Sequence, residues 1–193
     1  MSFVDIRRTY FNAPTNPEEP TYVALPPEDP DHDKGLCGLL LRFMYGTQKA
    51  AEGWQAEYSR ALAEDMGFKQ GVACPCIFSH AERDIVVTVH GDDFTAVGTP
   101  AALDKYETGI QEAFDCKLKG RLGTGPDDCK EMRVLNRIVR ITNDGLLYEA
   151  DPRHAEMLID AFHLENGKSV VTPGVKHSDP DVDPAQMDID AAT

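Results

Sequence analysis

Residues 86–97 read VVTVHGDDFTAV. Two runs rich in β-branched and aromatic residues flank a short Gly-Asp-Asp, which predicts a hairpin with adjacent carboxylates, Asp92 and Asp93, at its tip. Neighbouring carboxylates repel each other and gain nothing for folding. A metal cation is the usual compensation, and hard oxygen ligands suit Mg²⁺. A third carboxylate at this tip would allow a two-metal site for phosphoryl transfer.

Asp5 is the best candidate for the third carboxylate. It lies in the apolar run FVDI at residues 3–6, which predicts a short strand. An acidic residue is out of place there, and pairing of this strand beside the hairpin would bring Asp5 to the two tip aspartates. The alternative is an ordinary solvated aspartate at the end of a strand.

Composition and charge limit the classes of function. The chain of 193 residues has a formal net charge of −14. Its length fits one domain, or a compact domain with a trailing extension, and its acidity argues against a general nucleic-acid binder. The N-terminus lacks signal-peptide architecture, and no apolar run reaches the roughly 20 residues that span a membrane. We expect a soluble intracellular protein, cytoplasmic or nuclear and not secreted, without membrane contact.

The remaining periodicity predicts an α+β fold. Strands are predicted at residues 76–79, 85–89 and 94–97, and helices at residues 51–66 and 100–114, with Thr99-Pro100 as the N-terminal cap of the second helix. Residues 134–142 and 146–148 predict a second hairpin around Asn143-Asp144-Gly145. Asp151-Pro152 predicts the start of a last helix, ended by Asn166-Gly167, whose inward residues would be Met157, Leu158, Ala161 and Phe162. The order is compatible with a split βαβ core covered by helices on one face.

Six segments resemble a known family in order and spacing. They read VDIRRTYFN at residues 4–12, EPTYVALPP at 19–27, MYGTQKAAEGW at 44–54, HGDD at 90–93, DGLLY at 144–148 and VTP at 171–173. These are similar to the blocks DVKTAFLNG, EEVYMEQPPG, LYGLKQAPRAW, YVDD, DGIYLSQ and VSTP of copia-type LTR retrotransposon reverse transcriptases. The likeness covers most of residues 3–176 and is carried by the order of the blocks.

The resemblance implies a fold and a division of the chain. The family fold is the polymerase palm, a ferredoxin-like split βαβ antiparallel sheet with helices on one face, followed by a hairpin and a thumb-like helix. By this likeness residues 1–130 would form the palm-like catalytic core. Residues 131–176 would form a primer-grip-like hairpin and the start of the thumb, and residues 177–193 an acidic disordered tail.

The resemblance also implies an activity, which is RNA-directed DNA polymerisation. Asp5 and Asp92 would bridge two Mg²⁺ ions, or Mn²⁺, with Asp93 in support, for transfer of a nucleotide from a dNTP to a primer 3′-hydroxyl on an RNA or DNA template. Tyr10 would pack against the deoxyribose, or be an ordinary half-buried aromatic residue. Lys49 would contact a phosphate as a point charge, or be a solvated lysine at a helix start.

Two lysines and the start of the chain leave alternatives open. Lys117 and Lys119 could donate a proton to the leaving pyrophosphate, or form a solvated charge run. The family has a fingers region upstream of the first catalytic aspartate, whereas this chain begins almost at Asp5. We therefore expect an N-terminally truncated fragment, for which a protein partner could supply the fingers. The alternatives are an inactive retroelement-derived domain that binds nucleic acid or protein, and a magnesium phosphohydrolase.

Overall fold

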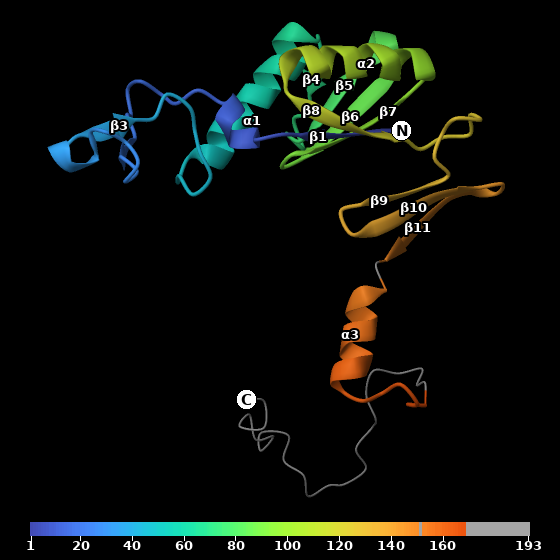
Figure 1. Cartoon of the computed structure of the whole chain (residues 1–193). Helices are drawn as coiled ribbons and strands as arrows, with labels where there is room; N and C mark the ends of the chain where they lie inside the picture. The colour runs from blue at the N-terminus through green and yellow to red at the C-terminus, as the bar shows by residue number, and fades with distance from the viewer. Residues whose placement is uncertain (151, 169–193) are drawn as a thin grey trace, which may run out of the picture. The chain divides into compact units, whose positions relative to one another are not determined.

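A computed structural model describes residues 1–150 and 152–168, which divide into two units, Met1–Glu149 and Ala150–Thr193. The first unit contains a six-stranded sheet with two α-helices on one face (Figure 1). Its sheets are antiparallel, so the predicted α+β class is confirmed. The predicted tail at residues 177–193 lies outside the described residues.

The N-terminal strand lies inside the main sheet rather than at its edge. It pairs with a strand from the Gly-Asp-Asp hairpin on one side and with a later strand on the other. The order is β4 (Lys69–Gln70), β5 (Ile77–His80), β6 (Ile85–His90), β7 (Asp93–Gly98), β1 (Ser2–Ile6) and β8 (Cys116–Arg121). The strands predicted at residues 3–6, 85–89 and 94–97 are present, and the strand predicted at residues 76–79 forms one residue later, as β5.

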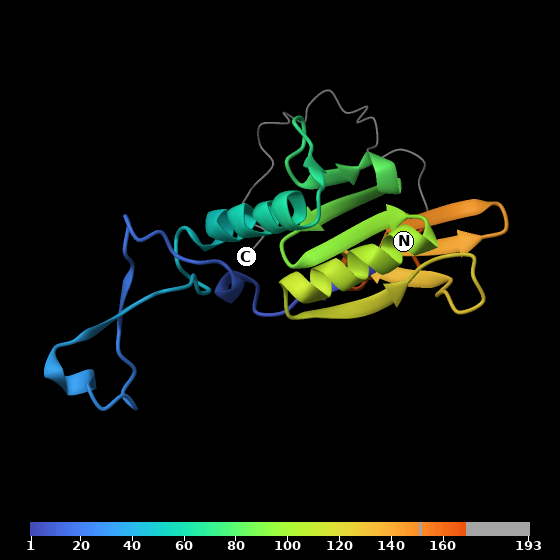
Figure 2. The same ribbon diagram turned by 90° about the horizontal axis from the view of Figure 1, so that it is seen from above.

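Two helices cover one face of this sheet (Figure 2). The first predicted helix forms as α1 (Ala50–Arg60) and continues as the single π-helical turn η3 (Ala61–Asp65). The second is α2 (Pro100–Ala113), and the Thr99 hydroxyl caps it by accepting a hydrogen bond from the N–H of Ala102 at 3.3 Å. The main core lies between these helices and the sheet.

Residues of β1 alternate between the two faces of the sheet, as strand geometry requires. Val4 and Ile6 belong to the core under the helices, whereas Phe3 packs on the opposite side with Leu122 and Val139. Asp5 shares the side of Phe3, because residues two apart in a strand point the same way. We call the side opposite α1 and α2 the open face.

A three-stranded sheet follows, with β9 (Glu131–Val134), β10 (Arg137–Thr142) and β11 (Gly145–Ala150). The prediction of one strand over residues 134–142 is wrong, because a two-residue turn at Leu135 and Asn136 divides it. Both turn residues have left-handed backbones, with φ of 46° and 59°. Asparagine tolerates this conformation and leucine rarely adopts it. Only one of the two residues, Asn136, therefore indicates a turn in the sequence.

The second unit contains α3 (Arg153–Ala161), which starts where the sequence predicts and ends before the predicted stop at residues 166–167. Its apolar side chains Met157, Leu158 and Phe162, which the sequence predicts to point inward, are not covered within this unit. A short helix buries an apolar face only against another element, and the described residues of this unit contain no second helix or strand. Asp151, the predicted cap, lies outside the described residues.

The segment between β1 and α1 contains the short turns η1 (Thr9–Asn12) and η2 (His32–Lys34) and a two-stranded ribbon, β2 (Tyr22–Ala24) paired with β3 (Cys37–Leu39). The ribbon extends away from the main sheet (Figure 2). A fourth turn, η4 (Ala81–Arg83), joins β5 to β6. Among the described residues no helix has the length and apolar character needed to cross a membrane.

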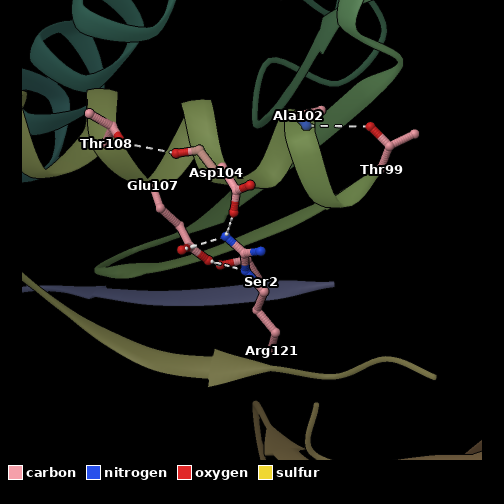
Figure 3. Close-up of polar contacts among 7 residues, drawn as sticks. All are labelled: Ser2, Thr99, Ala102, Asp104, Glu107, Thr108 and Arg121. Carbon is pink, nitrogen blue, oxygen red and sulfur yellow. Dashed lines mark hydrogen bonds and ion pairs between the residues drawn. The ribbon is translucent and has the colours of Figure 1, made fainter. Parts of the chain in front are cut away.

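A polar network under α2 fixes the far end of β1 and β8 (Figure 3). The Ser2 hydroxyl donates to Glu107 at 2.6 Å, and the Arg121 guanidinium donates to Glu107 at 2.7 and 2.8 Å and to Asp104 at 2.8 Å. Partial burial raises the pKa of Glu107, but the hydrogen bonds from Arg121 and Ser2 outweigh burial and hold this pKa below its usual value. The network therefore anchors both strands to the helix layer.

Candidate active site

Asp5 and Asp93 are directly opposed across the antiparallel pair of β1 and β7. Opposed residues of a pair point to the same face, so both carboxylates lie on the open face. Both side chains are about one-third exposed, at 33% and 32%. The structure thus brings together two of the three aspartates that the sequence singled out.

Asp92 lies one residue earlier, in the turn between β6 and β7. His90 pairs with Asp93, which leaves Gly91 and Asp92 as a two-residue hairpin turn, and Gly91 has the positive φ of 63° that favours glycine. The Asp92 carbonyl accepts a hydrogen bond from the N–H of Ile6 at 2.9 Å. The predicted hairpin is confirmed, and its turn is bonded to the end of β1.

Lys119 contacts both opposed carboxylates. Its Nζ lies 2.8 Å from Asp5 Oδ2 and 2.7 Å from Asp93 Oδ1. Partial burial lowers the pKa of Lys119, but the hydrogen bonds to Asp5 and Asp93 outweigh this effect and raise that pKa above its usual value. A single ammonium therefore offsets the charge repulsion that the paired aspartates would otherwise suffer.

An irregularity in β8 places Lys119 at this point. Val4 pairs with Leu118 and Phe3 pairs with Gly120, so Lys119 is an extra residue opposite one step of β1. Such a β-bulge redirects a side chain and is common beside functional sites. Gly120 follows with a φ of 120°, which favours glycine. Sequence reasoning treated Lys119 as one of two equivalent lysines, because a bulge has no periodic signal.

Tyr10 and Asp92 line one small cavity of about 100 Å³. Its other walls are Thr9, Tyr45, Trp54 and Gly91. The Tyr10 and Tyr45 rings meet edge to face with their centroids 4.7 Å apart. Tyr10 therefore stands beside the Gly-Asp-Asp turn. Tyr45 was missed, although its aromatic side chain lies within one of the blocks that carry the resemblance.

A larger cleft of about 480 Å³ lies between the open face and the β9–β10 turn. It is lined by residues of β1, β7, β8 and the β9–β10 turn, namely Phe3, Val4, Asp93, Phe94, Thr95, Lys119 and residues 133–136. Asp93 and Lys119 stand in its wall. The open face is therefore accessible to a ligand at the place where the carboxylates meet.

Lys49 lies apart from these carboxylates. It forms an exposed ion pair with Glu19, and both residues line a separate groove of about 490 Å³ beside α1. A hydrogen bond to Glu19 raises the pKa of Lys49 above its usual value. The structure therefore does not bring Lys49 together with Asp5, Asp92 and Asp93.

Asp5 and Asp93 are the residues of this site that could hold a divalent cation. Carboxylate oxygens are the ligands that Mg²⁺ prefers, and those of Asp5 and Asp93 already converge on one cationic nitrogen. Within residues 1–150 and 152–168, no three or more His, Cys, Asp or Glu side chains are grouped to hold a metal. Two carboxylates therefore converge, and exposed Asp92 lies next to them on the turn.

No protein-family model matches this chain, and no curated protein matches it.

Proposed function

We propose that this chain is the palm-like part of a copia-type RNA-directed DNA polymerase, which transfers a nucleotide from a dNTP to a primer 3′-hydroxyl. One observation carries the proposal. Asp5 and Asp93 come from the first and fourth resembling blocks, and they are directly opposed on the open face. Two blocks that were identified from the sequence alone therefore contribute carboxylates to one place on the sheet. The proposed catalytic site requires such a convergence.

The topology gives independent support. Within the main sheet the order β6-β7-β1-β8, with α1 following β1 and α2 following the hairpin, is that of two interleaved βαβ units. This is the split βαβ arrangement expected of a palm-like, ferredoxin-like fold. The hairpin turn of β9 and β10 borders the cleft, as a primer-grip-like element would.

The proposed chemistry assigns each residue a task. The resemblance implies that Asp5 and Asp92 bridge the metals, whereas Asp93 is the residue opposed to Asp5 in the sheet. In the proposal, Asp5 and Asp93 would therefore hold a divalent metal, with Asp92 in support. The metal would lower the pKa of the primer hydroxyl and neutralise the triphosphate. Tyr10 would limit the space beside the sugar, because it walls the cavity that Asp92 shares. Lys117, in register with Asp5, would attract phosphate groups to the open face.

One observation favours a second candidate, a domain that binds nucleic acid or protein without catalysis. Lys119 already neutralises part of the charge of Asp5 and Asp93, so the pair is stable as a structural salt bridge. A retroelement-derived domain that has lost its activity would keep this fold. The two candidates differ in whether the carboxylates are needed for nucleotide transfer.

Primer extension separates the candidates. The full chain would be incubated with an RNA template, a DNA primer, dNTPs and either Mg²⁺ or Mn²⁺. We expect extension that Asp5→Asn, Asp92→Asn and Asp93→Asn each abolish, whereas Asp144→Asn in the exposed β10–β11 turn leaves it unchanged. If the folded wild type extends no primer with either metal, the catalytic proposal fails. Binding to the same hybrid at low salt would then test the second candidate.

A further inference from the structure

The opposed carboxylates share one ammonium. Lys119 Nζ is within 2.8 Å of an oxygen from each of Asp5 and Asp93. Any cation that binds both carboxylates at this point would meet this ammonium, because the same oxygens would be its ligands. The contact is therefore directly relevant to ion binding at the open face.

Backbone geometry selects Lys119 for this contact over its neighbour. Lys117 pairs directly with Asp5 in the ladder, yet its side chain forms no hydrogen bond or ion pair with the part of the chain that the structure describes. The extra residue in β8 instead directs Lys119 across Asp5 to β7. The salt bridge therefore depends on the position of Lys119 in the bulge, and the presence of several lysines in β8 does not explain it.

We propose that Lys119 is a built-in competing cation, which occupies the carboxylate pair in the metal-free protein and must leave before a divalent ion binds Asp5 and Asp93. The inference rests on the proposed function in assuming that a divalent ion belongs at these residues. Binding is then an exchange of one cation for another. The affinity for the metal is set below the value that two unpaired carboxylates would give.

Mn²⁺ binding to the full chain tests this exchange without any measurement of polymerase activity. The free Mn²⁺ signal in electron paramagnetic resonance gives the affinity of the wild type and of Lys119→Met. Because charge attraction at contact distance is large even at a high effective dielectric constant, Lys119→Met is expected to bind on the order of tenfold more tightly. Lys119→Arg keeps the cation and is expected to bind as weakly as the wild type.

A double variant corrects for aspartates elsewhere in the chain, which also attract Mn²⁺. The affinity gained in Lys119→Met should disappear in the combination Asp5→Asn with Lys119→Met. A second measurement follows Lys119 in the wild type, so its main result does not depend on the folding of a variant, and Asp5→Asn serves only as its control. The ¹³Cε signal of Lys119 should move toward that of an exposed lysine as Mg²⁺ is added, and should stay fixed in Asp5→Asn.

The outcomes distinguish this inference from the proposed function. Equal Mn²⁺ affinity in the wild type and Lys119→Met, with a fixed Lys119 signal, would overturn the competition and leave the metal site intact. Absence of binding in both proteins would overturn the competition together with the metal chemistry of the proposed function. Tighter binding in Lys119→Met that requires Asp5 supports the exchange.

Discussion

The indole Nε1 of Trp54 donates a hydrogen bond to the carbonyl oxygen of Gly91 at 2.8 Å. Trp54 lies on α1 and is only 2% exposed, and Gly91 belongs to the turn that carries Asp92. A buried side chain on the helix layer therefore holds a turn at the end of the sheet. Trp54 is a core residue that also positions the candidate site.

Trp54→Phe should weaken this link. We expect the free energy of unfolding to fall by about 1–3 kcal/mol, from lost packing volume and a carbonyl left without its partner. Urea denaturation followed by circular dichroism measures the loss. The amide of Ile6, which bonds to the Asp92 carbonyl, should exchange faster with solvent. Tyr58→Phe, on the same helix, is the control and should leave exchange at Ile6 unchanged.

The carboxylate of Glu107 makes the free energy of unfolding depend on pH. Its pKa is held below the usual value in the folded protein, so its contribution is fully present above the unfolded pKa and is lost as pH falls through the folded one. We expect Glu107→Gln to lower the free energy of unfolding at pH 7 by about 1–2 kcal/mol and to flatten its decline between about pH 5 and pH 3.

Urea denaturation at several pH values measures this difference between Glu107→Gln and the wild type. Asp104→Asn is the matched control, because Asp104 contacts the same guanidinium but its side chain is 67% exposed. Its effect should stay below about 0.5 kcal/mol. Parallel pH profiles for the wild type and Glu107→Gln would show that this carboxylate does not contribute.

Lys117 should contribute to nucleic-acid binding through charge alone. Under the proposed function, Lys117→Gln weakens the affinity for an RNA–DNA hybrid and reduces the slope of log affinity against log salt concentration by about 0.9, the value for one phosphate contact. Fluorescence anisotropy over a salt series measures this slope. Lys105→Gln on α2, the helix that covers the opposite side of the sheet, should leave the slope unchanged. Equal slopes for all three proteins would place the binding surface elsewhere.

Tyr10 should affect the choice of sugar. Because its ring walls the cavity beside Asp92, Tyr10→Ala is expected to reduce the preference for dNTPs over rNTPs by about tenfold in kcat/KM, the scale of a steric contact. Single-nucleotide extension with each substrate measures the ratio. Tyr10→Phe keeps the ring and should keep the preference, so a loss of preference in this variant would point to the hydroxyl instead.

Local sequence signals predicted most of the architecture. The cap at Thr99, the apolar face of α1 and the Gly91-Asp92 turn depend on residues close in the chain, and each appears where predicted. The proximity of Asp5 to the hairpin aspartates also followed, from the assumption that its strand pairs beside the hairpin. Such features are readable because propensity, spacing and turn chemistry agree at these positions.

Features that depend on register between distant strands were not predictable. The contact of Lys119 requires one extra residue opposite β1, and no pattern within β8 reveals which lysine gains it. The turn at Leu135 was hidden because leucine rarely takes a left-handed backbone. The exposed apolar side of α3 shows that periodicity predicts an apolar face without predicting what covers it.

The β8 bulge also determines how the strand's cations are shared between the two faces. Lys117 and Lys119 serve the open face, whereas Arg121, two positions later, pairs with Ser2 and joins the network under α2. In a regular strand all three would share one face. Loss of a single residue here would therefore redistribute charge between the two surfaces while hardly shortening the strand. An insertion or deletion at this point of the chain would therefore change the charge of both faces of the sheet.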